Sequence, residues 1–174
     1  LAVRNFTSRD DAISMLDAGE VEMTMGVPPT STGRILSAPL FEERFVCILR
    51  KDHPAIRQGL NLETFLSLTH LLVSPENDRF GVVDTALAKQ GLKRQLALTL
   101  PQLYAAPALV ASSDMIATIL EGVVEASGQA ERLYVGSPPI ELDPVPFTLS
   151  WHRRNDTHPA QRWFRDRVIE VFSV

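Results

Sequence analysis

Two polar turns contain the residues of this chain that are best suited to bind a small molecule. The first turn, residues 74–81, follows an apolar run that ends at Val73 and precedes a helical pattern. The second turn, residues 101–104, follows alternating leucines and precedes another helical pattern. Open α/β sheets hold ligands where strands end and helices begin. The two turns therefore predict a binding site rather than a catalytic one.

The residue types in these turns suit an organic anion. Helices expected to start at Gly81 and Gln102 would present free backbone N–H groups and a partial positive charge, which favour a carboxylate or a phenolate. Ser74, Asn77 and Gln102 could orient such a ligand by hydrogen bonds. Asn77 and Asp78 have a second interpretation, because their side chains commonly satisfy the backbone of their own turn.

Aromatic side chains near the same turns could stack on an aromatic ligand. Phe80 and Tyr104 belong to the turns, and Phe6 comes from a polar stretch near the start of the chain. Packing inside the protein is the alternative role for Phe80 and Tyr104, since aromatic residues dominate core burial. Trp151 could likewise line a binding site or fill space at a hinge.

The sequence favours neither catalysis nor a metal site. It has no G-x-S-x-G, Walker A, H-E-x-x-H or G-x-G-x-x-G motif. Its four histidines, at 53, 70, 152 and 158, lack metal-ligand spacing with acidic or cysteine partners. Paired carboxylates such as Glu42 with Glu43 lie in polar sequence without signs of burial. We expect no enzyme activity, no cofactor and no metal.

Composition indicates an ordinary globular chain. It has 174 residues, 45% hydrophobic and 22% charged, with a formal charge of -4 that gives no electrostatic footprint for nucleic acid. Cys47 is the sole cysteine, so no intrachain disulfide is possible. Without a signal-peptide or membrane-span pattern, the expected location is the cytoplasm. The start at Leu1, without methionine and already in strand-like sequence, suggests a piece of a longer protein.

Hydrophobic periodicity predicts alternating strands and helices, including one complete parallel crossover unit over residues 71–100. Ser8 and Gly19 are expected to bound the first helix, and Pro159 to begin the last one, whose apolar face would include Trp163 and Val171. Further helices are expected at 62–66, 81–90 and 102–111. The expected strands are residues 1–4, 21–25, 35–38, 45–49, 71–73, 96–100, 115–120, 133–135 and 146–151.

Five segments in order resemble the effector-binding domain of LysR-type transcriptional regulators. Their order and spacing carry the resemblance, which is greatest to the branch of nodulation and aromatic-catabolism regulators. The segments are MLDAGEVEMTMGV at 15–27, FEERFVCILRKDHPAI at 41–56, SPENDRFGVVDTALAKQGL at 74–92, PALVASSDMIATI at 107–119 and LSWHRRNDTHPAQRWFRD at 149–166.

The resemblance implies a two-lobed α/β fold similar to type 2 periplasmic binding proteins, each lobe a mixed sheet flanked by helices. Lobe one is expected to comprise residues 1–73 plus 147–174, and lobe two residues 74–146. By the same resemblance, we expect that the family's N-terminal winged helix-turn-helix, and the first strand and helix of lobe one, are absent from this chain. The ligand cleft lies between the lobes in such a fold.

The implied function is to sense a small organic effector, aromatic or carboxylate, and so to alter DNA contacts made through the missing N-terminal domain. Dimers or tetramers are expected, with helices near residues 10–18 and 82–89 as candidate contacts between subunits. No interaction with a membrane is expected. A solute-binding protein of a transport system is the alternative, since it shares the fold. The expected ligand-binding residues are Asn5, Phe6, Thr7, Ser74, Asn77, Phe80, Gly81, Pro101, Gln102, Tyr104 and Trp151.

Overall fold

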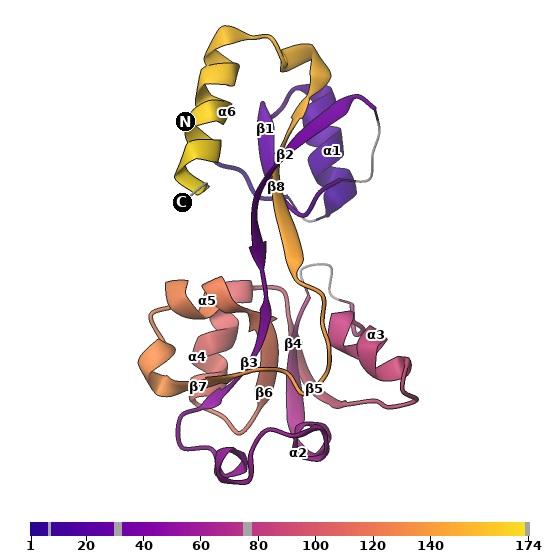
Figure 1. Ribbon diagram of the computed structural model, residues 1–174, viewed down its shortest axis with the longest axis vertical. Coiled ribbons are helices and arrows are strands. Elements are labelled where there is room, and N and C mark those ends of the chain that lie inside the picture. The colour runs from indigo at the N-terminus through magenta and orange to yellow at the C-terminus, as the bar shows by residue number, and fades with distance from the viewer. Residues whose placement is uncertain (7, 30–32, 75–77, 173–174) are drawn as a thin grey trace. The chain divides into compact units, whose positions relative to one another are not determined.

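The computed structural model describes residues 1–6, 8–29, 33–74 and 78–172 (Figure 1). Contacts between residues divide the chain into two compact units. Unit 1 comprises Leu1–Glu43 and Val145–Val174, and unit 2 comprises Arg44–Pro144. The chain therefore passes from one unit to the other twice.

Unit 1 is built on a three-stranded antiparallel sheet with helices on either side (Figure 1). The strand order is β1 (Met23–Gly26), β8 (Val145–His152) and β2 (Ile35–Glu43). Helix α1 (Arg9–Ala18) packs on β1 and β8, and helix α6 (Pro159–Phe172) packs on β2. A strand from the far end of the sequence thus forms the middle of this sheet.

The ends of α1 agree with the residues predicted to bound it. The Ser8 side chain caps the helix, because its oxygen accepts a hydrogen bond from the backbone N–H of Asp11 at 3.1 Å. Gly19 follows the helix with a φ of 73°, a left-handed conformation that glycine adopts without steric cost. Ala12 and Leu16 are the buried residues of α1, and they fix which face of the helix covers the sheet.

Unit 2 contains a mixed five-stranded sheet. Its order is β5 (Gln95–Leu100), β4 (Thr69–Val73), β6 (Ile116–Leu120), β3 (Phe45–Arg50) and β7 (Leu133–Gly136). Strand β4 runs parallel to β5 and β6, whereas β3 runs antiparallel to β6 and β7. The predicted parallel crossover from β4 to β5 is confirmed.

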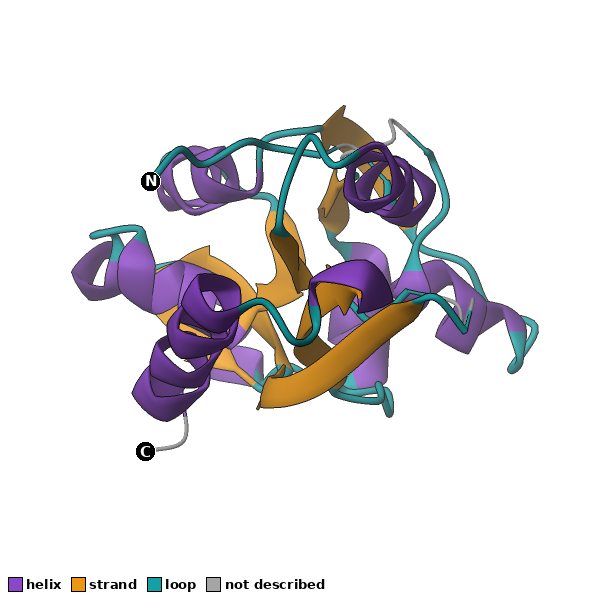
Figure 2. Cartoon of the chain, turned by 90° about the horizontal axis from the view of Figure 1, so that it is seen from above, coloured by secondary structure: helices purple, strands orange, loops and turns teal. Residues whose placement is uncertain are grey.

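Helices cover both faces of this sheet. Figure 2 distinguishes the helices and strands of the whole chain by colour. On one face, α4 (Ala106–Ala111) and α5 (Glu121–Ala126) contribute to one apolar core. On the other, α2 (Leu62–Ser67) and α3 (Val82–Ala88) contribute to a second core. Short 3-10 turns complete the chain at Pro54–Gln58, Leu103–Ala105, Ala130–Arg132 and, in unit 1, Arg153–Asn155.

The structure divides the chain at Glu43, not at Val73 where the first lobe boundary was expected. The reason is strand pairing, because β3 and β4 both pair with β6 and so belong to the same sheet. A break after Val73 would separate strands of one hydrogen-bonded sheet. The second division, after Pro144, falls within two residues of the expected one.

Two expectations about the chain's ends were wrong. Residues 1–4 form no strand, and Leu1 and Val3 are exposed. An alternating sequence makes a strand only where a neighbouring strand satisfies its backbone groups. Trp163 and Val171 were expected on the buried face of α6, yet both are exposed. The buried side chain on that helix is instead the cationic Arg165.

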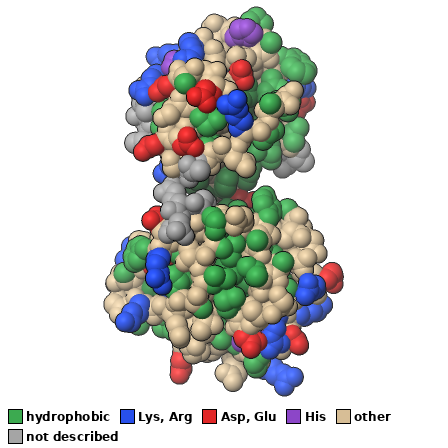
Figure 3. Space-filling view, turned by 180° about the vertical axis from the view of Figure 1, so that it is seen from behind, with side chains coloured by type: hydrophobic (Ala, Val, Ile, Leu, Met, Phe, Trp, Pro, Cys, Tyr) green, Lys and Arg blue, Asp and Glu red, His purple; other side chains and the backbone are tan. Residues whose placement is uncertain are grey.

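The surface carries charges of both signs. On the face drawn in Figure 3, basic and acidic side chains are interspersed over both units. Within the described ranges, none of the helices has the length and apolar character needed to cross a membrane.

His70 is a titratable group enclosed in the core of unit 2, with 0% of its surface exposed. Its Nε2 lies 2.8 Å from the carbonyl oxygen of Phe65 and must donate, since a carbonyl only accepts. The Phe65 ring packs edge-on against the imidazole. The other nitrogen, Nδ1, is buried without a partner among the described residues. Burial lowers the pKa of His70 to about 4.

This pKa predicts a loss of stability in mild acid. The pKa of histidine in an unfolded chain is near 6.5. Below that pH the unfolded chain binds a proton at His70, whereas His70 stays neutral in the folded protein. The free energy of unfolding should fall by roughly 2 kcal/mol between pH 7.5 and pH 5 from this residue alone. Urea unfolding at both pH values should show a smaller fall for His70→Leu. The exposed His158 is the control, and an equal effect of His158→Asn would contradict the assignment.

Candidate functional site

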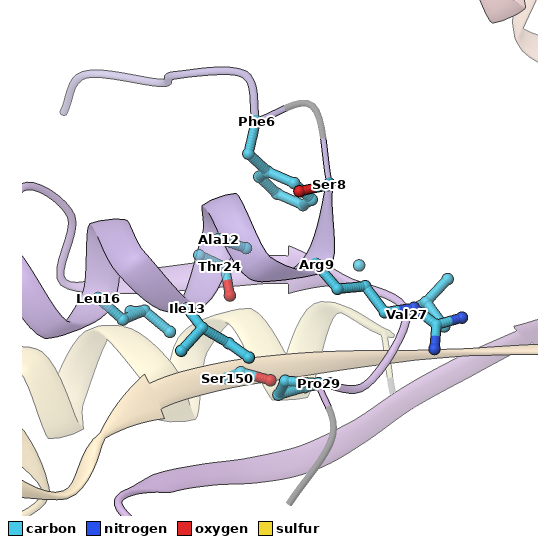
Figure 4. Close-up of a pocket in the computed structure, with 11 residues that line it drawn as sticks. Phe6, Ser8, Arg9, Ala12, Ile13, Leu16, Thr24, Val27, Pro29 and Ser150 are labelled. Atoms are coloured by element: carbon cyan, nitrogen blue, oxygen red, sulfur yellow. The ribbon is translucent and has the colours of Figure 1, made fainter. Parts of the chain in front are cut away.

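A hollow of about 100 Å³ opens on unit 1 between α1 and the sheet (Figure 4). Every described residue that lines it belongs to unit 1. Eleven of the described residues surround it: Phe6, Ser8, Arg9, Ala12, Ile13, Leu16, Thr24, Gly26, Val27, Pro29 and Ser150.

One face of α1 forms the wall of this hollow. Residues 9, 12, 13 and 16 line it, and this spacing places all four on one side of a helix. Ala12 and Ile13 have hydrocarbon side chains, so the wall is apolar between the two ends of the helix. Arg154 fixes the far end of α1, because its Nη1 donates to the Asp17 carbonyl oxygen at 2.8 Å.

The sheet forms the floor, and Phe6 closes one side. Thr24, Gly26 and Ser150 contribute from β1 and β8. The Phe6 ring lies directly on Gly26, since a Cβ atom built there would lie 3.1 Å from the ring. Any larger residue at this position would push the ring away, so glycine sets the place of Phe6 beside the hollow.

Arg9 is the cation of the hollow. It occupies the first position of α1, beside the partial positive charge of the helix N-terminus. Within the described parts of the chain, no carboxylate forms a salt bridge with its guanidinium. In Figure 4 its side chain extends along the hollow toward Val27. An apolar cavity with an available guanidinium suits a small ligand that has an apolar body and an anionic group.

In unit 2, Ser74 holds together the first of the two predicted turns. Its backbone N–H donates to the Leu100 carbonyl oxygen, and its Oγ accepts from the backbone N–H of Asp78, both at 2.9 Å. The first bond brings this turn beside the end of β5, where Pro101 and Gln102 follow. The start of the first segment, Ser74, therefore lies beside the end of the strand that precedes the second segment, as neighbouring parallel strands require.

A buried ion pair fixes the helix that follows this turn. The Asp84 carboxylate accepts two hydrogen bonds from Arg94, at 2.9 and 2.7 Å, and one from the backbone N–H of Gly81, at 2.8 Å. The Arg94 side chain is only 2% exposed. Burial by itself would raise the pKa of Asp84, but the bonds from Arg94 and Gly81 outweigh it and lower that pKa. The Gly81 N–H is thus engaged within the protein.

The predicted aromatic residues of unit 2 face outward. Phe80 is 61% exposed and Tyr104 is 65% exposed, so neither fills a core. Pro101 and Gln102 are exposed as well, and so is Asn5 in unit 1. Two further candidates, at positions 7 and 77, lie outside the described residues.

Trp151 has partners within unit 1 on both its ring face and its N–H. The indole Nε1 donates to Asp156 Oδ1 at 2.9 Å, and the Arg165 guanidinium lies 4.6 Å from the ring centroid. A cation over an indole face is a favourable contact. These contacts give Trp151 a structural role in joining β8 to α6.

Of the predicted ligand-binding residues that the structure describes, Phe6 alone lines the hollow. Arg9, Thr24 and Ser150 were not predicted as site residues. Helical spacing on α1 contained the signal for Arg9, since residues 9, 12, 13 and 16 share a face. Nothing in the local sequence joins Thr24 to Ser150, because strand pairing alone brings these distant residues side by side.

Comparison with known proteins identifies the family. The model of the LysR substrate binding domain matches residues 4–173. The chain belongs to this family. It is 30% identical over 158 residues to the transcriptional activator NagR of Ralstonia sp, covering 91% of this chain and 52% of that protein. It is also 30% identical to the transcriptional regulator SyrM of Rhizobium meliloti, covering 94% and 50%. The chain thus spans about half the length of the curated relatives it matches.

Solved structures agree. A probable transcriptional regulator from Pseudomonas aeruginosa superposes with a TM-score of 0.82 at 28% identity, covering 95% of this chain and 54% of that one. The MexT regulatory domain from the same organism superposes with a TM-score of 0.77 at 26% sequence identity. The match covers 90% of this chain and 76% of that one. The effector binding domain of QuiR, in complex with shikimate, superposes with a TM-score of 0.73 at 15% sequence identity, over 92% of this chain and 76% of that one. At this identity the likeness supports the fold alone.

These matches confirm the resemblance read from the sequence, together with the α/β fold similar to type 2 periplasmic binding proteins. The relatives are transcriptional regulators, not solute-binding proteins of transport systems.

The Asp84–Arg94 pair yields a stability prediction. Removing one member of a buried ion pair leaves the other charge uncompensated, which costs about 3 to 5 kcal/mol. Asp84→Ala should lower the free energy of unfolding by roughly 3 kcal/mol in urea at pH 7. The exposed pair between Arg167 and Glu170 provides the control. Glu170→Ala should cost less than about 1 kcal/mol, and similar losses from both variants would contradict the structural role of Asp84.

Proposed function

We propose that this chain is the effector-sensing domain of a DNA-binding transcription regulator. The observation that carries the proposal is the hollow on unit 1, where apolar walls adjoin the available guanidinium of Arg9. A small organic acid, aromatic or aliphatic, binds there without being consumed. Membership of the LysR substrate binding domain family supports this assignment.

The physical basis is a division of labour within the hollow. Ala12, Ile13 and Leu16 exclude water from the apolar body of the ligand, and burial of that body supplies most of the binding energy. Arg9 forms a charge-assisted hydrogen bond with the carboxylate. A hollow of about 100 Å³ limits the ligand to a single ring or a short chain.

The rest of the regulator turns binding into a signal. A ligand shifts a conformational equilibrium only by its different affinity for the two states. Effector binding would alter contacts with DNA that a helix-turn-helix domain makes elsewhere in the protein. Association into dimers or tetramers, in the cytoplasm, belongs to the same proposal. The relatives that support it are named as transcriptional activators and regulators.

Three turn residues of unit 2, buried Ser74 and exposed Gln102 and Tyr104, remain part of the proposal. Ser74 accepts a hydrogen bond through its Oγ, which leaves its own proton to donate to a ligand. Gln102 and Tyr104 are exposed and carry polar groups. We propose that these residues offer hydrogen bonds to a polar ligand at the surface of unit 2.

A thermal-shift screen tests the proposal. The purified protein would be melted with aromatic acids, phenols, flavonoids and aliphatic acids. A ligand at 100 times its dissociation constant should stabilise the folded state by about 2.7 kcal/mol. The expected result is a reproducible upward shift from acids, which Arg9→Gln diminishes and the exposed-site variant Arg167→Gln does not. The proposal fails if no compound shifts the melting of a well-folded sample, or if a compound is chemically converted.

A further inference from the structure

The floor of the hollow carries a row of hydroxyl groups. Thr24, Ser150 and Ser37 are register partners across β1, β8 and β2, so their side chains lie in one line on the same face of the sheet. Ser150 is the central member and is 2% exposed. Thr24 and Ser150 line the hollow, whereas Ser37 lies beyond it.

Hydrogen bonds join the hydroxyls of Ser37, Ser150 and Thr148 into a chain that ends on the backbone. The Ser37 and Ser150 Oγ atoms are 2.8 Å apart. Ser150 Oγ lies 3.3 Å from Thr148 Oγ1, and Thr148 Oγ1 donates to the Gly26 carbonyl oxygen at 3.4 Å. The side chains of Thr148 and Ser150 share a face because they are two residues apart in one strand.

The carbonyl at the end of this chain sets the direction of every proton in it. A carbonyl only accepts, and each hydroxyl has a single proton. Thr148 uses its proton on Gly26, so Ser150 must donate to Thr148, and Ser37 must donate to Ser150. Ser150 then has no proton left. Its one remaining lone pair makes it an acceptor at the floor of the hollow.

We propose that Ser150 selects effectors that carry a hydroxyl group. This inference rests on the proposed function and names its ligand class, which is a small hydroxylated organic acid. The carboxylate pairs with Arg9, the apolar body lies against α1, and the hydroxyl donates to Ser150 Oγ. A ligand without a donor leaves the second lone pair of Ser150 unused and forms one hydrogen bond fewer in the hollow, so it binds more weakly.

Calorimetric titration of the purified protein with benzoate and its three monohydroxy isomers tests the selectivity. At least one isomer should bind roughly 5- to 10-fold more tightly than benzoate, the ratio expected for one net hydrogen bond. The isomer whose hydroxyl reaches Ser150 is the one favoured.

Two variants separate selection by Ser150 from a structural effect. Ser150→Ala removes the acceptor, so the preference for that isomer should vanish while benzoate binds as before. Thr148→Val is similar in size to the original and keeps Ser150. It frees the Ser150 proton to turn into the hollow, so the preference should fall by at least about threefold. Ser37→Ala is the matched control, because Ser150 remains an acceptor in that variant and the preference should persist.

Distinct results would overturn the inference and the proposed function. Equal binding of benzoate and all isomers, a preference that survives Ser150→Ala, or binding only of other acids would overturn the role of Ser150 and leave effector sensing in place. Failure of every class of compound to bind the folded protein would overturn both.

Discussion

The pairing of β8 with both β1 and β2 is the constraint on which unit 1 depends. This strand comes from residues 145–152, yet it forms the middle of a sheet whose other strands lie within the first 43 residues. It supplies Ser150 to the floor of the hollow. Just beyond it, Arg154 donates to carbonyl groups at the C-terminal end of α1. One strand thus forms the floor of the site and holds its wall in place.

Polar groups outside the hollow have mostly structural partners. Trp151 is engaged by Asp156 and Arg165, and the Gly81 N–H is engaged by Asp84. Such contacts hold helices and turns where strands end. The hollow differs because its cation, Arg9, has no salt-bridge partner among the described residues. An unpaired cation beside apolar walls is typical of a ligand-binding pocket, whereas polar groups that already pair within the protein have a structural role.

Local patterns were sufficient to predict most elements, because they depend on residues near one another. Ser8 and Gly19 bound α1 as their cap chemistry predicts, and β4 and β5 form the parallel pair expected from a crossover. Burial and domain boundaries depend on partners that are distant in the sequence, and local patterns did not predict them correctly. Leu98 alternates with Leu96 and Leu100 in the sequence, yet Leu98 is exposed while Leu100 is buried, and a register shift lies between His70 and Leu71 of the neighbouring strand. The division at Glu43 likewise follows from which strands pair with β6.

The same limit explains the site. Phe6 was predicted because its segment, residues 5–7, was expected to face the ligand and its ring could stack on an aromatic one. Ser150 became a candidate only when strand pairing placed it opposite Thr24 and beneath α1. A family resemblance predicts the fold, but it does not show which hydroxyl groups of the sheet line the hollow.

The most direct test fills the hollow without altering any polar group. Ile13 lies on the wall of α1, and Ile13→Trp places an indole in the space assigned to the ligand. Calorimetric titration with an acid that stabilises the wild-type protein should then show binding weakened at least about 100-fold, since steric exclusion removes the site. Urea unfolding would verify that the variant folds. Undiminished affinity in a folded Ile13→Trp protein would contradict the account, because the effector would have to bind elsewhere.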